Sequence, residues 1–382
     1  MLSLADLIHR AKQTPLYKDW DFSNVSTFGD PYWQHLPTLS KDDLRNFPVL
    51  HGDENGLLMF FSSGTTGTPK MVGYSKADLE RIGELCARFA KLEGITPQSR
   101  VMVLLPMALW SVGKITIEGH MRLGAQVFPV DLHGGIPLWQ YMADLIRPTV
   151  ISSTPSVLAA WAMEYHGPRL QLVETTGEPL LIWERQVIEA RFGAFVHDSY
   201  GLSECVVGVE CRVRNGFHFW EDAVGIEIVD PETKKTLEHG QVGEIVVTSF
   251  MQEHVPIIRY RTGDLGYIVP EPCPCGRQLP KLKLKGRLGK NTVILPRAVK
   301  LEEEVLTMAL EEVGAKGTFV WKSKPENPAS LYLKDQFKPT LEIQITNIEK
   351  TVSMEYIEKH ILKSIPDLSE LVFEKELRLV VS

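Results

Sequence analysis

The sequence predicts an α/β protein with a large N-terminal domain of doubly wound, mainly parallel sheets plus a β subdomain, followed by a small α+β C-terminal domain. The first observation is that short apolar runs alternate with amphipathic segments from Gly56 to about residue 191, as strands and helices alternate in open parallel sheets. The second is a change after Gly208 to short strand-like runs separated by turn residues. The third is length, because 382 residues can bury one large domain or two unequal ones.

Composition narrows the class of protein. Hydrophobic residues make up 44% of the chain and charged residues 23%, close to globular averages, which excludes a disordered, collagen-like or coiled-coil chain. The net charge of −7 argues against nucleic acid or an anionic membrane as a partner and favours a small ligand. No apolar run reaches the roughly 18 residues of a membrane span. The first ten residues lack a secretory pattern and the five cysteines form no disulfide framework, so we expect a cytoplasmic protein.

The elements follow in order. Leu4, Leu7 and Ile8 have helical spacing and are followed by prolines and scattered aromatics, which predicts a strap of short helices and loops. The predicted strands of the parallel sheet are residues 57–61, 101–105, 126–130, 149–152 and 171–175. The predicted helices between and after them are residues 79–92, 110–123, 138–146, 156–165 and 181–191.

The later part of the chain divides near Arg287. Short runs at residues 227–229, 243–248 and 257–260 predict an antiparallel β subdomain, and the charged strand 281–287 ends at its edge. We therefore place the boundary between domains of residues 1–286 and 287–382, and we expect the second to be small and mobile. In the second domain we expect helices at 301–313 and 351–365 and strands at 317–322, at 341–346, near Leu371 and near Leu377.

A segment rich in glycine and hydroxyl groups follows the first predicted strand. Its backbone N–H groups, hydroxyls and final lysine suit a polyphosphate, whereas an ordinary surface loop seldom gathers so many donors. The segment is Ser62-Ser63-Gly64-Thr65-Thr66-Gly67-Thr68-Pro69-Lys70. It is not a Walker loop, because Pro69 stands where the second glycine is required and Met71 follows the lysine. Ser75, with Asp78 three residues on, is expected to cap the next helix.

Four further motifs occur downstream in a fixed order, and with them the sequence resembles the adenylate-forming enzymes. That superfamily comprises acyl-CoA synthetases, peptide-synthetase adenylation domains and luciferases. The motifs are Thr176-Gly177-Glu178-Pro179, Asp198-Ser199-Tyr200-Gly201-Leu202-Ser203-Glu204, Tyr260-Arg261-Thr262-Gly263-Asp264 and Gly286-Arg287. Together they are far more specific than any one of them alone.

The resemblance implies a role for each motif residue. Thr66, Lys70 and Glu204 are the candidate catalytic residues, and Glu204 is suited to hold the Mg²⁺ that bridges ATP phosphates. Asp264 is expected to accept the ribose hydroxyls and Tyr200 to stack on adenine, although a core tyrosine and a solvated glutamate are the alternatives at 200 and 204. The full candidate nucleotide site is Ser62, Ser63, Gly64, Thr65, Thr66, Gly67, Lys70, Gly177, Glu178, Pro179, Ser199, Tyr200, Gly201, Asp264 and Arg287.

Within the superfamily the closest likeness is to phenylacetate–CoA ligases and related aryl-acid ligases. It rests on residues 36–45, 215–222 and 273–277. It implies that ATP activates an aryl or heteroaryl acid to acyl-AMP, with AMP and pyrophosphate as by-products, and that CoA then takes the acyl group. The family's acyl pocket lies between central helices and sheet, which makes five residues candidates by position alone. These are Trp110, Phe128, His133, Trp139 and Tyr200.

A metal site is also expected. Cys211 and His218, followed by Cys273 and Cys275, supply four soft or borderline ligands that suit tetrahedral zinc. A zinc ion held by four protein ligands has no open coordination position, so it would be structural. The resemblance implies the same, because some related aryl-acid ligases have similar cysteines and a similar histidine. Reduced thiols without a metal remain the alternative, because Cys-x-Cys is shorter than the usual zinc knuckle. Cys205 has no visible histidine partner and is not expected to be a nucleophile.

The C-terminal part departs from the family pattern. The usual Gly-Lys loop is absent, and Lys375 is the nearest lysine. The junction reads Gly286-Arg287-Leu288-Gly289 where Gly-Arg-x-Asp is usual. Two further functions therefore stay open: transfer of the acyl group to a carrier-protein thiol or an amine, and AMP binding without turnover. A homodimer is possible by resemblance.

Overall fold

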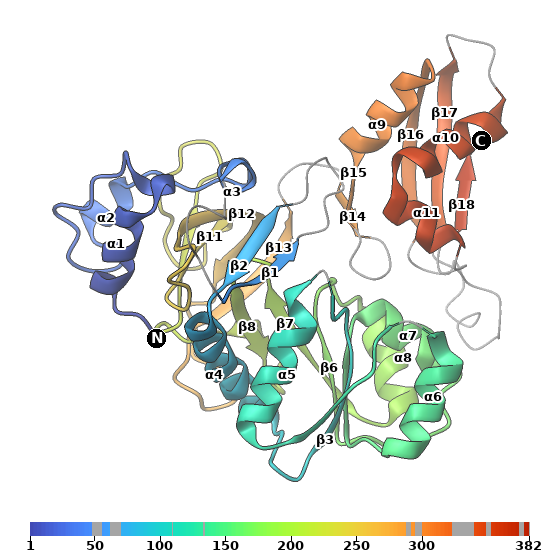
Figure 1. Cartoon of the computed structure of the whole chain (residues 1–382), viewed down its shortest axis with the longest axis horizontal. Coiled ribbons are helices and arrows are strands. Elements are labelled where there is room, and N and C mark those ends of the chain that lie inside the picture. Colours follow the sequence, from blue (N-terminus) through green and yellow to red (C-terminus); the bar gives the residue numbers. More distant parts are fainter. Residues whose placement is uncertain are drawn as a thin grey trace.

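The computed structural model describes residues 1–47, 56–61, 70–108, 110–132, 134–287, 292–294, 300–322, 340–348, 353–373 and 378–381 (Figure 1). Eleven strands form one large sheet in the order β10-β11-β12-β13-β9-β8-β7-β6-β5-β3-β4. One half of this sheet is parallel and the other antiparallel, and β7 belongs to both. The predicted fold class, α/β with a β subdomain and a smaller α+β part, is confirmed.

The parallel half is built from strand–helix repeats at the predicted positions. Its strands are β3 (Arg100–Leu104), β4 (Gln126–Pro129), β5 (Val150–Ser153), β6 (Leu172–Thr175) and β7 (Phe195–Gly201). Its helices are α4 (Lys76–Glu93), α5 (Ser111–Leu123), α6 (Gly135–Ile146), α7 (Pro155–Ala162) and α8 (Ile182–Phe192). The predicted cap of α4 is present, because Ser75 and Asp78 form a reciprocal capping box.

The two faces of the parallel half are packed differently. Alternate side chains of a strand point to opposite faces, so Val173 packs under α6–α8 whereas Leu172 packs under α4 and α5. Figure 1 shows α4 and α5 on one side of the sheet and α6–α8 on the other. This division decides which residues can line a site beneath α4 and α5.

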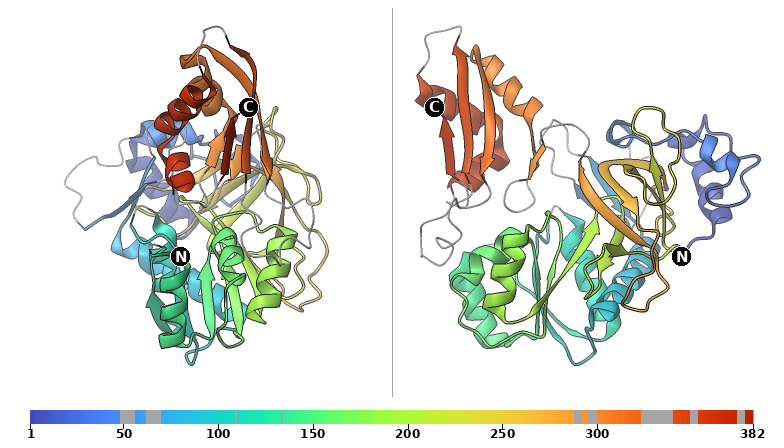
Figure 2. Two further views of the ribbon diagram at one scale, coloured as in Figure 1. Left: turned by 90° about the vertical axis from the view of Figure 1, so that its right-hand side faces the viewer. Right: turned by 180° about the vertical axis from the view of Figure 1, so that it is seen from behind.

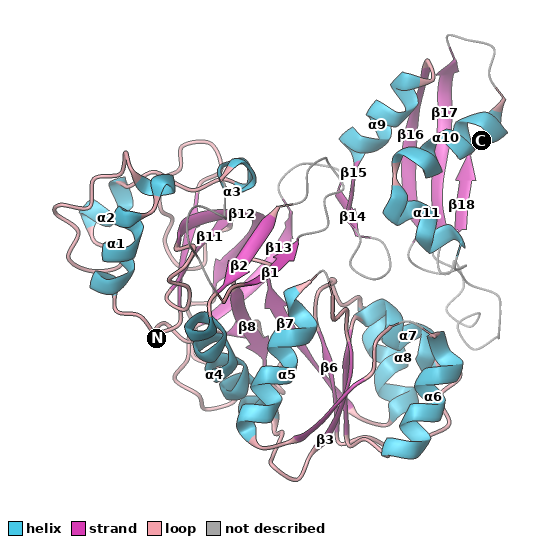
Figure 3. Cartoon of the chain, viewed as in Figure 1, coloured by secondary structure: helices cyan, strands magenta, loops and turns pink. Residues whose placement is uncertain are grey.

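The antiparallel half contains β8 (Val206–Glu210), β9 (Phe217–His218), β10 (Val224–Val229), β11 (Gly243–Ser249), β12 (Ile257–Ile268) and β13 (Lys281–Arg287). Strands β8 and β9 were not predicted, and β12 extends eight residues beyond the predicted run, through the turn-like Thr-Gly-Asp sequence. A register shift between Leu265 and Gly266 accommodates that sequence within the strand. Figure 3 shows how the strands of this half continue from the parallel half.

The first predicted strand is not part of the parallel sheet. β1 (Leu58–Phe61) pairs antiparallel with β2 (Met71–Tyr74) in a separate two-stranded sheet. Leu58 lies opposite Tyr74 and Phe61 opposite Met71, so the ladder joins the two ends of the glycine-rich segment. An apolar run of four residues fits either a hairpin or a parallel strand, which is why the sequence did not distinguish them.

The N-terminal strap consists of α1 (Leu4–Gln13), the 3₁₀ helix η1 (Pro15–Tyr17), α2 (Pro31–His35) and α3 (Lys41–Asn46). It is fastened to the antiparallel half by the buried Arg259. The Arg259 guanidinium pairs with both carboxylate oxygens of Glu227 and donates to the backbone carbonyls of Gln34 and Leu36. Trp33 Nε1 also donates to Glu227, at 2.9 Å. The strap is therefore held by a buried ion pair as well as by apolar packing.

The C-terminal part has its own apolar core. It contains β14 (Thr292–Ile294), β15 (Lys300–Glu302), α9 (Glu303–Glu312), β16 (Ala315–Lys322), β17 (Thr340–Ile348), α10 (Met354–Ser364), α11 (Pro366–Phe373) and β18 (Arg378–Val381). Strands β16, β17 and β18 form one sheet, with the helices against it (Figure 2). The strand predicted near Leu371 is wrong, because Pro366 starts a helix there and Leu368 and Val372, one turn apart, pack into this core.

No helix of the described residues combines the length and the apolar character needed to cross a bilayer.

Candidate active site

Most of the predicted phosphate-binding segment lies outside the described residues. Its members Ser62, Ser63, Gly64, Thr65, Thr66 and Gly67 stay predictions. Lys70, at the start of β2, is described and 4% exposed. It forms an ion pair with Glu204, and its ammonium lies 5.7 Å from the centroid of the Tyr260 ring. The two predicted catalytic residues Lys70 and Glu204 are therefore in contact.

Glu204 is held in place by three neighbours. Tyr260 donates its hydroxyl hydrogen to Glu204 Oε1 at 2.6 Å, and Gln252 Nε2 donates to the Glu204 carbonyl at 2.7 Å. Lys70 is the third neighbour. Glu204 follows the turn after β7, while Tyr260 projects from β12. The junction of the parallel and antiparallel halves thus positions a buried carboxylate beside a lysine.

The predicted adenine and ribose residues also meet. Tyr200, near the carboxyl end of β7, donates its hydroxyl hydrogen to Asp264 Oδ2 at 2.7 Å. Asp264 follows Gly263, whose φ of +75° suits glycine, and its N–H donates to Thr262 Oγ1 at 3.0 Å. Arg287 lies opposite Asp264 in the β12–β13 register, and its side chain lies outside the described residues. These positions come from three strands that are distant in sequence.

The Thr-Gly-Glu-Pro turn follows β6. Glu178 accepts hydrogen bonds from the backbone N–H of Ser156 at 3.0 Å and from its hydroxyl at 2.8 Å, which fixes the turn to the start of α7. Ser199 donates to the Thr175 carbonyl at 3.1 Å. Pro179 continues the same turn. Whether this turn faces adenine stays a prediction.

A cavity of about 170 Å³ lies under α4 and α5, on the sheet face formed by β6 and β7. Gly177, Ser199, Tyr200 and Gly201 line it, together with Trp110 at the start of α5. Much of the remaining wall is apolar, from residues Phe89, Ala90, Ile115, Val206 and Val209. The cavity therefore adjoins the candidate nucleotide residues.

Two of the five positional candidates for the acyl pocket do not line this cavity. Phe128 and Trp139 pack under α6–α8, on the opposite face of the sheet, and Trp139 meets Trp161 at a centroid distance of 6.2 Å. Trp110 and Tyr200 do line the cavity. His133 lies outside the described residues. Position between a helix and a strand did not tell which face of the sheet a side chain takes.

A set of four buried polar side chains in the cavity was not predicted from the sequence. It consists of Glu93, His120, Ser152 and Glu174, which we name the acid–histidine cluster. His120 Nε2 lies 3.0 Å from Glu174 Oε1, and His120 Nδ1 lies 2.7 Å from the Thr116 carbonyl oxygen. The available signal was Glu174 itself, a charged residue inside the apolar strand Leu172–Thr175.

The charges of this cluster are coupled. Burial acts to lower the pKa of His120, but the adjacent Glu174 carboxylate outweighs burial and raises that pKa. Burial acts to raise the pKa of Glu174, and the His120 ion pair reverses the shift and lowers it. Burial and then the charge of Glu174 raise the pKa of Glu93 well above its ordinary value. The ion pair between His120 and Glu174 thus favours the charged forms of both groups, whereas burial beside Glu174 favours the neutral form of Glu93.

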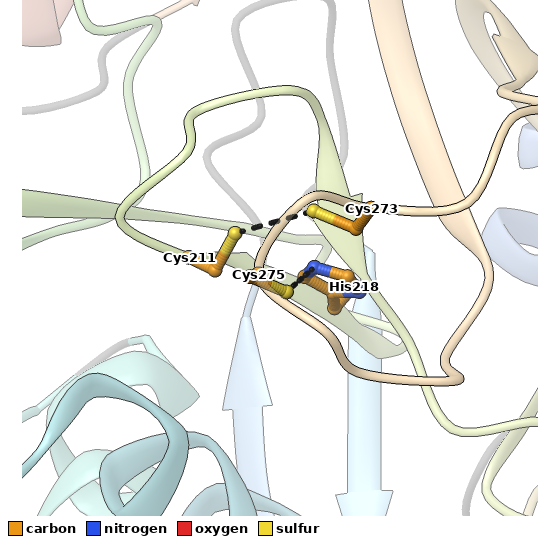
Figure 4. Close-up of side chains that lie close together, drawn as sticks. All are labelled: Cys211, His218, Cys273 and Cys275. Atoms are coloured by element: carbon orange, nitrogen blue, oxygen red, sulfur yellow. Dashed lines mark hydrogen bonds between the residues drawn. The ribbon is translucent and has the colours of Figure 1, made fainter.

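The four predicted zinc ligands converge beside β9, as Figure 4 shows. Their ligand atoms all lie within 4.8 Å of one another. Cys211 Sγ is 3.7 Å from Cys273 Sγ, and Cys275 Sγ is 3.4 Å from His218 Nε2. Zinc–sulfur and zinc–nitrogen bonds of about 2.3 and 2.0 Å in a tetrahedron separate such atoms by about 3.8 and 3.5 Å. The observed separations therefore fit a zinc ion.

The protonation of His218 and Cys275 also suits a metal, whereas burial raises the pKa of the Cys211 thiol to about 11. Burial lowers the pKa of His218, which keeps its ring neutral, and its Nδ1 lies 3.3 Å from the Leu279 carbonyl. That contact leaves Nε2 toward Cys275. Burial acts to raise the pKa of Cys275, but hydrogen bonds led by the Arg277 backbone hold it at about 7. Cys205, by contrast, is buried with a raised pKa, which agrees with its expected lack of nucleophilic character.

Comparison with known proteins agrees with these features. A sequence model of the family described as "AMP-binding enzyme" matches residues 11–251. A phenylacetate-coenzyme A ligase of Thermus thermophilus is 34% identical over 300 residues, covering 73% of this chain and 66% of the relative. The Escherichia coli enzyme of the same name is 31% identical over 329 residues, covering 78% of this chain and 73% of the relative.

The chain spans less than two thirds of the first two ligases it matches, 66% of the Thermus thermophilus protein and 65% of a Pseudomonas putida protein. Among solved structures, a 2-hydroxyisobutyryl-CoA ligase in complex with 2-HIB-AMP and CoA superposes with a TM-score of 0.79 at 21% identity. The superposition covers 99% of this chain and 85% of that one, which shows a shared fold. With the family match over residues 11–251, the chain belongs to the AMP-binding enzymes.

Proposed function

We propose that this protein uses ATP to activate an aryl or heteroaryl carboxylic acid as acyl-AMP and then forms a thioester with CoA. The observation that carries the proposal is that Lys70 pairs with Glu204 and Tyr200 with Asp264, and that Tyr200 also lines a largely apolar cavity. The names of the relatives, phenylacetate-coenzyme A ligases, support the choice of acid and thiol. The substrate is then bound under α4 and α5, and the nucleotide at the junction of the two half-sheets.

The chemistry would proceed in two steps. A carboxylate oxygen of the acid attacks the α-phosphorus of ATP, the bond to the β-phosphate oxygen breaks, and pyrophosphate leaves. The sulfur of CoA then attacks the acyl carbon, the acyl–oxygen bond breaks, and AMP leaves while the thiol proton goes to a base or to water. Lys70 would supply positive charge near the phosphates, and the largely apolar wall of the cavity would limit the access of water to acyl-AMP.

Glu204 is the residue we propose for Mg²⁺. Magnesium is usually held by one or two carboxylates together with waters and substrate phosphates, so a single buried carboxylate fits. When bound, the ion would neutralise phosphate charge. Lys70 and Tyr260 fix the orientation of the carboxylate.

The test is release of pyrophosphate and of AMP with benzoates, phenylacetates and anthranilates, each with and without CoA. We expect ATP- and acid-dependent pyrophosphate release, and CoA-dependent AMP release and thioester formation. Asp264→Ala should lower kcat/KM for ATP by roughly a hundredfold, since it removes a charged acceptor. Asp222→Ala, which removes an exposed partner of Arg88, is the matched control and should have little effect.

The same assay decides between the alternatives. AMP release that depends on an amine or a carrier protein instead of CoA would replace the second step. AMP binding in calorimetry without pyrophosphate release from any acid would identify a protein that has lost turnover, for which the missing Gly-Lys loop is the sequence argument. Failure to bind ATP or AMP would overturn the proposal altogether.

We also propose that Cys211, His218, Cys273 and Cys275 hold a structural zinc ion that ties β9 to the segment before β13. The fit of the ligand separations supports it. Metal analysis of the purified protein should find one zinc per chain, and Cys211→Ser should lose it. Cys86→Ser, a half-buried cysteine outside the cluster, is the control and should keep the metal. Protein that is fully folded and free of metal after purification in zinc-containing buffer would contradict the site.

We also propose the expected domain boundary, the cellular location and the oligomeric state. The boundary at 286/287 is supported by the separate apolar core after it, and mobility of the C-terminal domain stays a prediction. A cytoplasmic location is supported by free cysteines among the described residues. A homodimer stays a prediction.

A further inference from the structure

The cavity has two chemically different ends. Tyr74 donates its hydroxyl hydrogen to the Ser203 carbonyl at 2.5 Å, which brings the starts of α4 and α5 next to the turn that carries Glu204. Glu93 is the last residue of α4, and His120 lies nine residues after the first residue of α5, about 14 Å along that helix. The acid–histidine cluster therefore closes the end of the cavity remote from Glu204.

The cluster has a surplus of hydrogen-bond acceptors. The two carboxyl groups of Glu93 and Glu174 offer four oxygens, and each ionised carboxylate has about four acceptor positions. The cluster itself can supply hydrogens only from His120 Nε2, from the Ser152 hydroxyl and from Glu93 in its neutral form. His120 Nδ1 is already engaged with the Thr116 carbonyl, and Glu93 and Ser152 are hydrogen-bonding neighbours of the Glu174 carboxylate. Glu174 Oε2 is nevertheless buried without a well-aligned donor among the described residues. A bound molecule would complement this end by donating hydrogen bonds.

Packing alone gives no reason for such a cluster. A buried ion pair with a second acid beside it loses hydration free energy that apolar residues of the same size would not lose. The walls next to it, including Phe89, Ile115 and Val209, are apolar and would accept such residues. Glu93, His120 and Ser152 are each less than 5% exposed and Glu174 is 8% exposed, so each loses most of its contact with bulk water.

We propose that the acid–histidine cluster determines substrate specificity, selecting carboxylic acids that carry a hydrogen-bond donor, an amino group, a hydroxyl or a ring N–H, at the end remote from the carboxylate. Glu174 is the principal acceptor, and His120 is a positioning residue that holds Glu174 through Oε1. This inference rests on the proposed function, because it assumes that the cavity takes the acyl part of the substrate.

The test uses pairs of acids equal in size. Para-aminobenzoate and para-hydroxybenzoate are each compared with para-methylbenzoate. The corresponding meta-substituted benzoates and para-substituted phenylacetates place the donor at other distances from the carboxylate. Calorimetric titration measures binding, and pyrophosphate release measures kcat/KM. We expect at least one donor-bearing acid to exceed its methyl partner roughly ten- to a hundredfold in affinity and in kcat/KM.

Glu174→Gln tests the residue. The amide keeps the shape of the side chain and an acceptor for His120, but it loses the charge and presents an NH₂ group to the ligand. The preference for donor-bearing acids should fall about tenfold, while kcat/KM for the methyl partners changes by less than about threefold. Glu184→Gln is the matched control, a buried glutamate at the start of α8 outside the cavity, and should leave the preference unchanged.

Each outcome has one meaning. Donor-bearing acids that bind preferentially but release no pyrophosphate would support the cluster's role in recognition and contradict the proposed function. Turnover with equal kcat/KM for both members of every pair would overturn the specificity proposal and leave the proposed function standing. A preference that persists in Glu174→Gln, with an unchanged thermal midpoint, would also overturn it, as would failure of both members of every pair to bind.

Discussion

The two faces of the parallel half-sheet use the same strands for different purposes. Under α6–α8, Trp161 packs edge-on against Tyr165 and Phe192 in an apolar core. Under α4 and α5, Ser152 and Glu174 project from β5 and β6 into a cavity. The difference shows that one face is an apolar core throughout, whereas the other combines an apolar core with a cavity lined in part by polar groups that are costly to bury.

The largest expected effect is on the apolar face. Trp161→Ala should lower the free energy of unfolding by about 3–5 kcal/mol, because it leaves a large cavity among close-packed rings. Urea denaturation measures the change. Ile182→Ala, at a position 76% exposed, should change it by less than about 0.5 kcal/mol. A loss below about 1 kcal/mol at Trp161 would mean that this face is not the stable one.

On the cavity face, by contrast, replacing a pair of polar side chains by apolar ones should cost little free energy of unfolding. Glu174→Leu alone should cost about 3 kcal/mol, because His120 loses the partner of its buried charge. Changing both residues to leucine should recover most of that loss, as an apolar pair replaces an ion pair. A double-mutant cycle by urea denaturation measures this coupling. If the destabilisation of the double variant equalled the sum of the two single effects, His120 and Glu174 would not be coupled and the contrast between the faces would fail.

Two buried acidic residues, one in α8 and one in β7, should make the free energy of unfolding depend on pH. Burial raises the pKa of Glu184 and of Asp198 to about 8 each. Between the unfolded values near 4 and this native value, the folded protein retains protons that the unfolded chain has released, so rising pH favours unfolding. The stability that these protons confer is present below about pH 4 and lost by about pH 8.

We therefore expect the free energy of unfolding to fall between about pH 5 and pH 8. Each acid contributes at most about 1.4 kcal/mol per pH unit. Urea denaturation across this range measures the slope, and Glu184→Gln should reduce it. A slope unchanged by that substitution would show that Glu184 is ionised in the folded protein.

The smallest effect is expected where the two half-sheets meet. Tyr200→Phe removes the 2.7 Å hydrogen bond to Asp264 but keeps the ring in place. The unfolding free energy should fall by about 1 kcal/mol, in line with a single partly buried hydrogen bond. A loss above about 3 kcal/mol would indicate that the junction, rather than the apolar face, holds the sheet together.

The alternation of strands and helices in the parallel half could be predicted from the sequence, because each element has its own periodicity of apolar residues. Ser75 and Asp78 predicted the start of α4 by a purely local mechanism, and the structure confirms it. Leu371 was assigned to a strand because a short apolar run near the end of the chain has no decisive period, and the tertiary packing of α11 decided it. The pairing of β1 with β2 was likewise set by partners outside the run.

Sequence motifs predicted which residues come together better than position between a helix and a strand did. The four candidate zinc ligands, predicted from ligand type, do converge, and so do Tyr200 and Asp264. Phe128 and Trp139 were placed in the pocket without knowledge of which sheet face they take. The cluster of Glu93, His120 and Glu174 went unnoticed because its members are 27 and 54 residues apart and belong to no motif. Only folding gives them a common function.

The Arg259 fastening has a consequence for biosynthesis. Residues 31–36 emerge from the ribosome before the arginine whose guanidinium binds their carbonyls, which follows more than 200 residues later. At about 5–20 residues per second, these segments wait on the order of 10–45 s for each other. During that interval residues 31–36 lack the arginine that binds their carbonyls, so the strap can dock fully only after β12 has been synthesised.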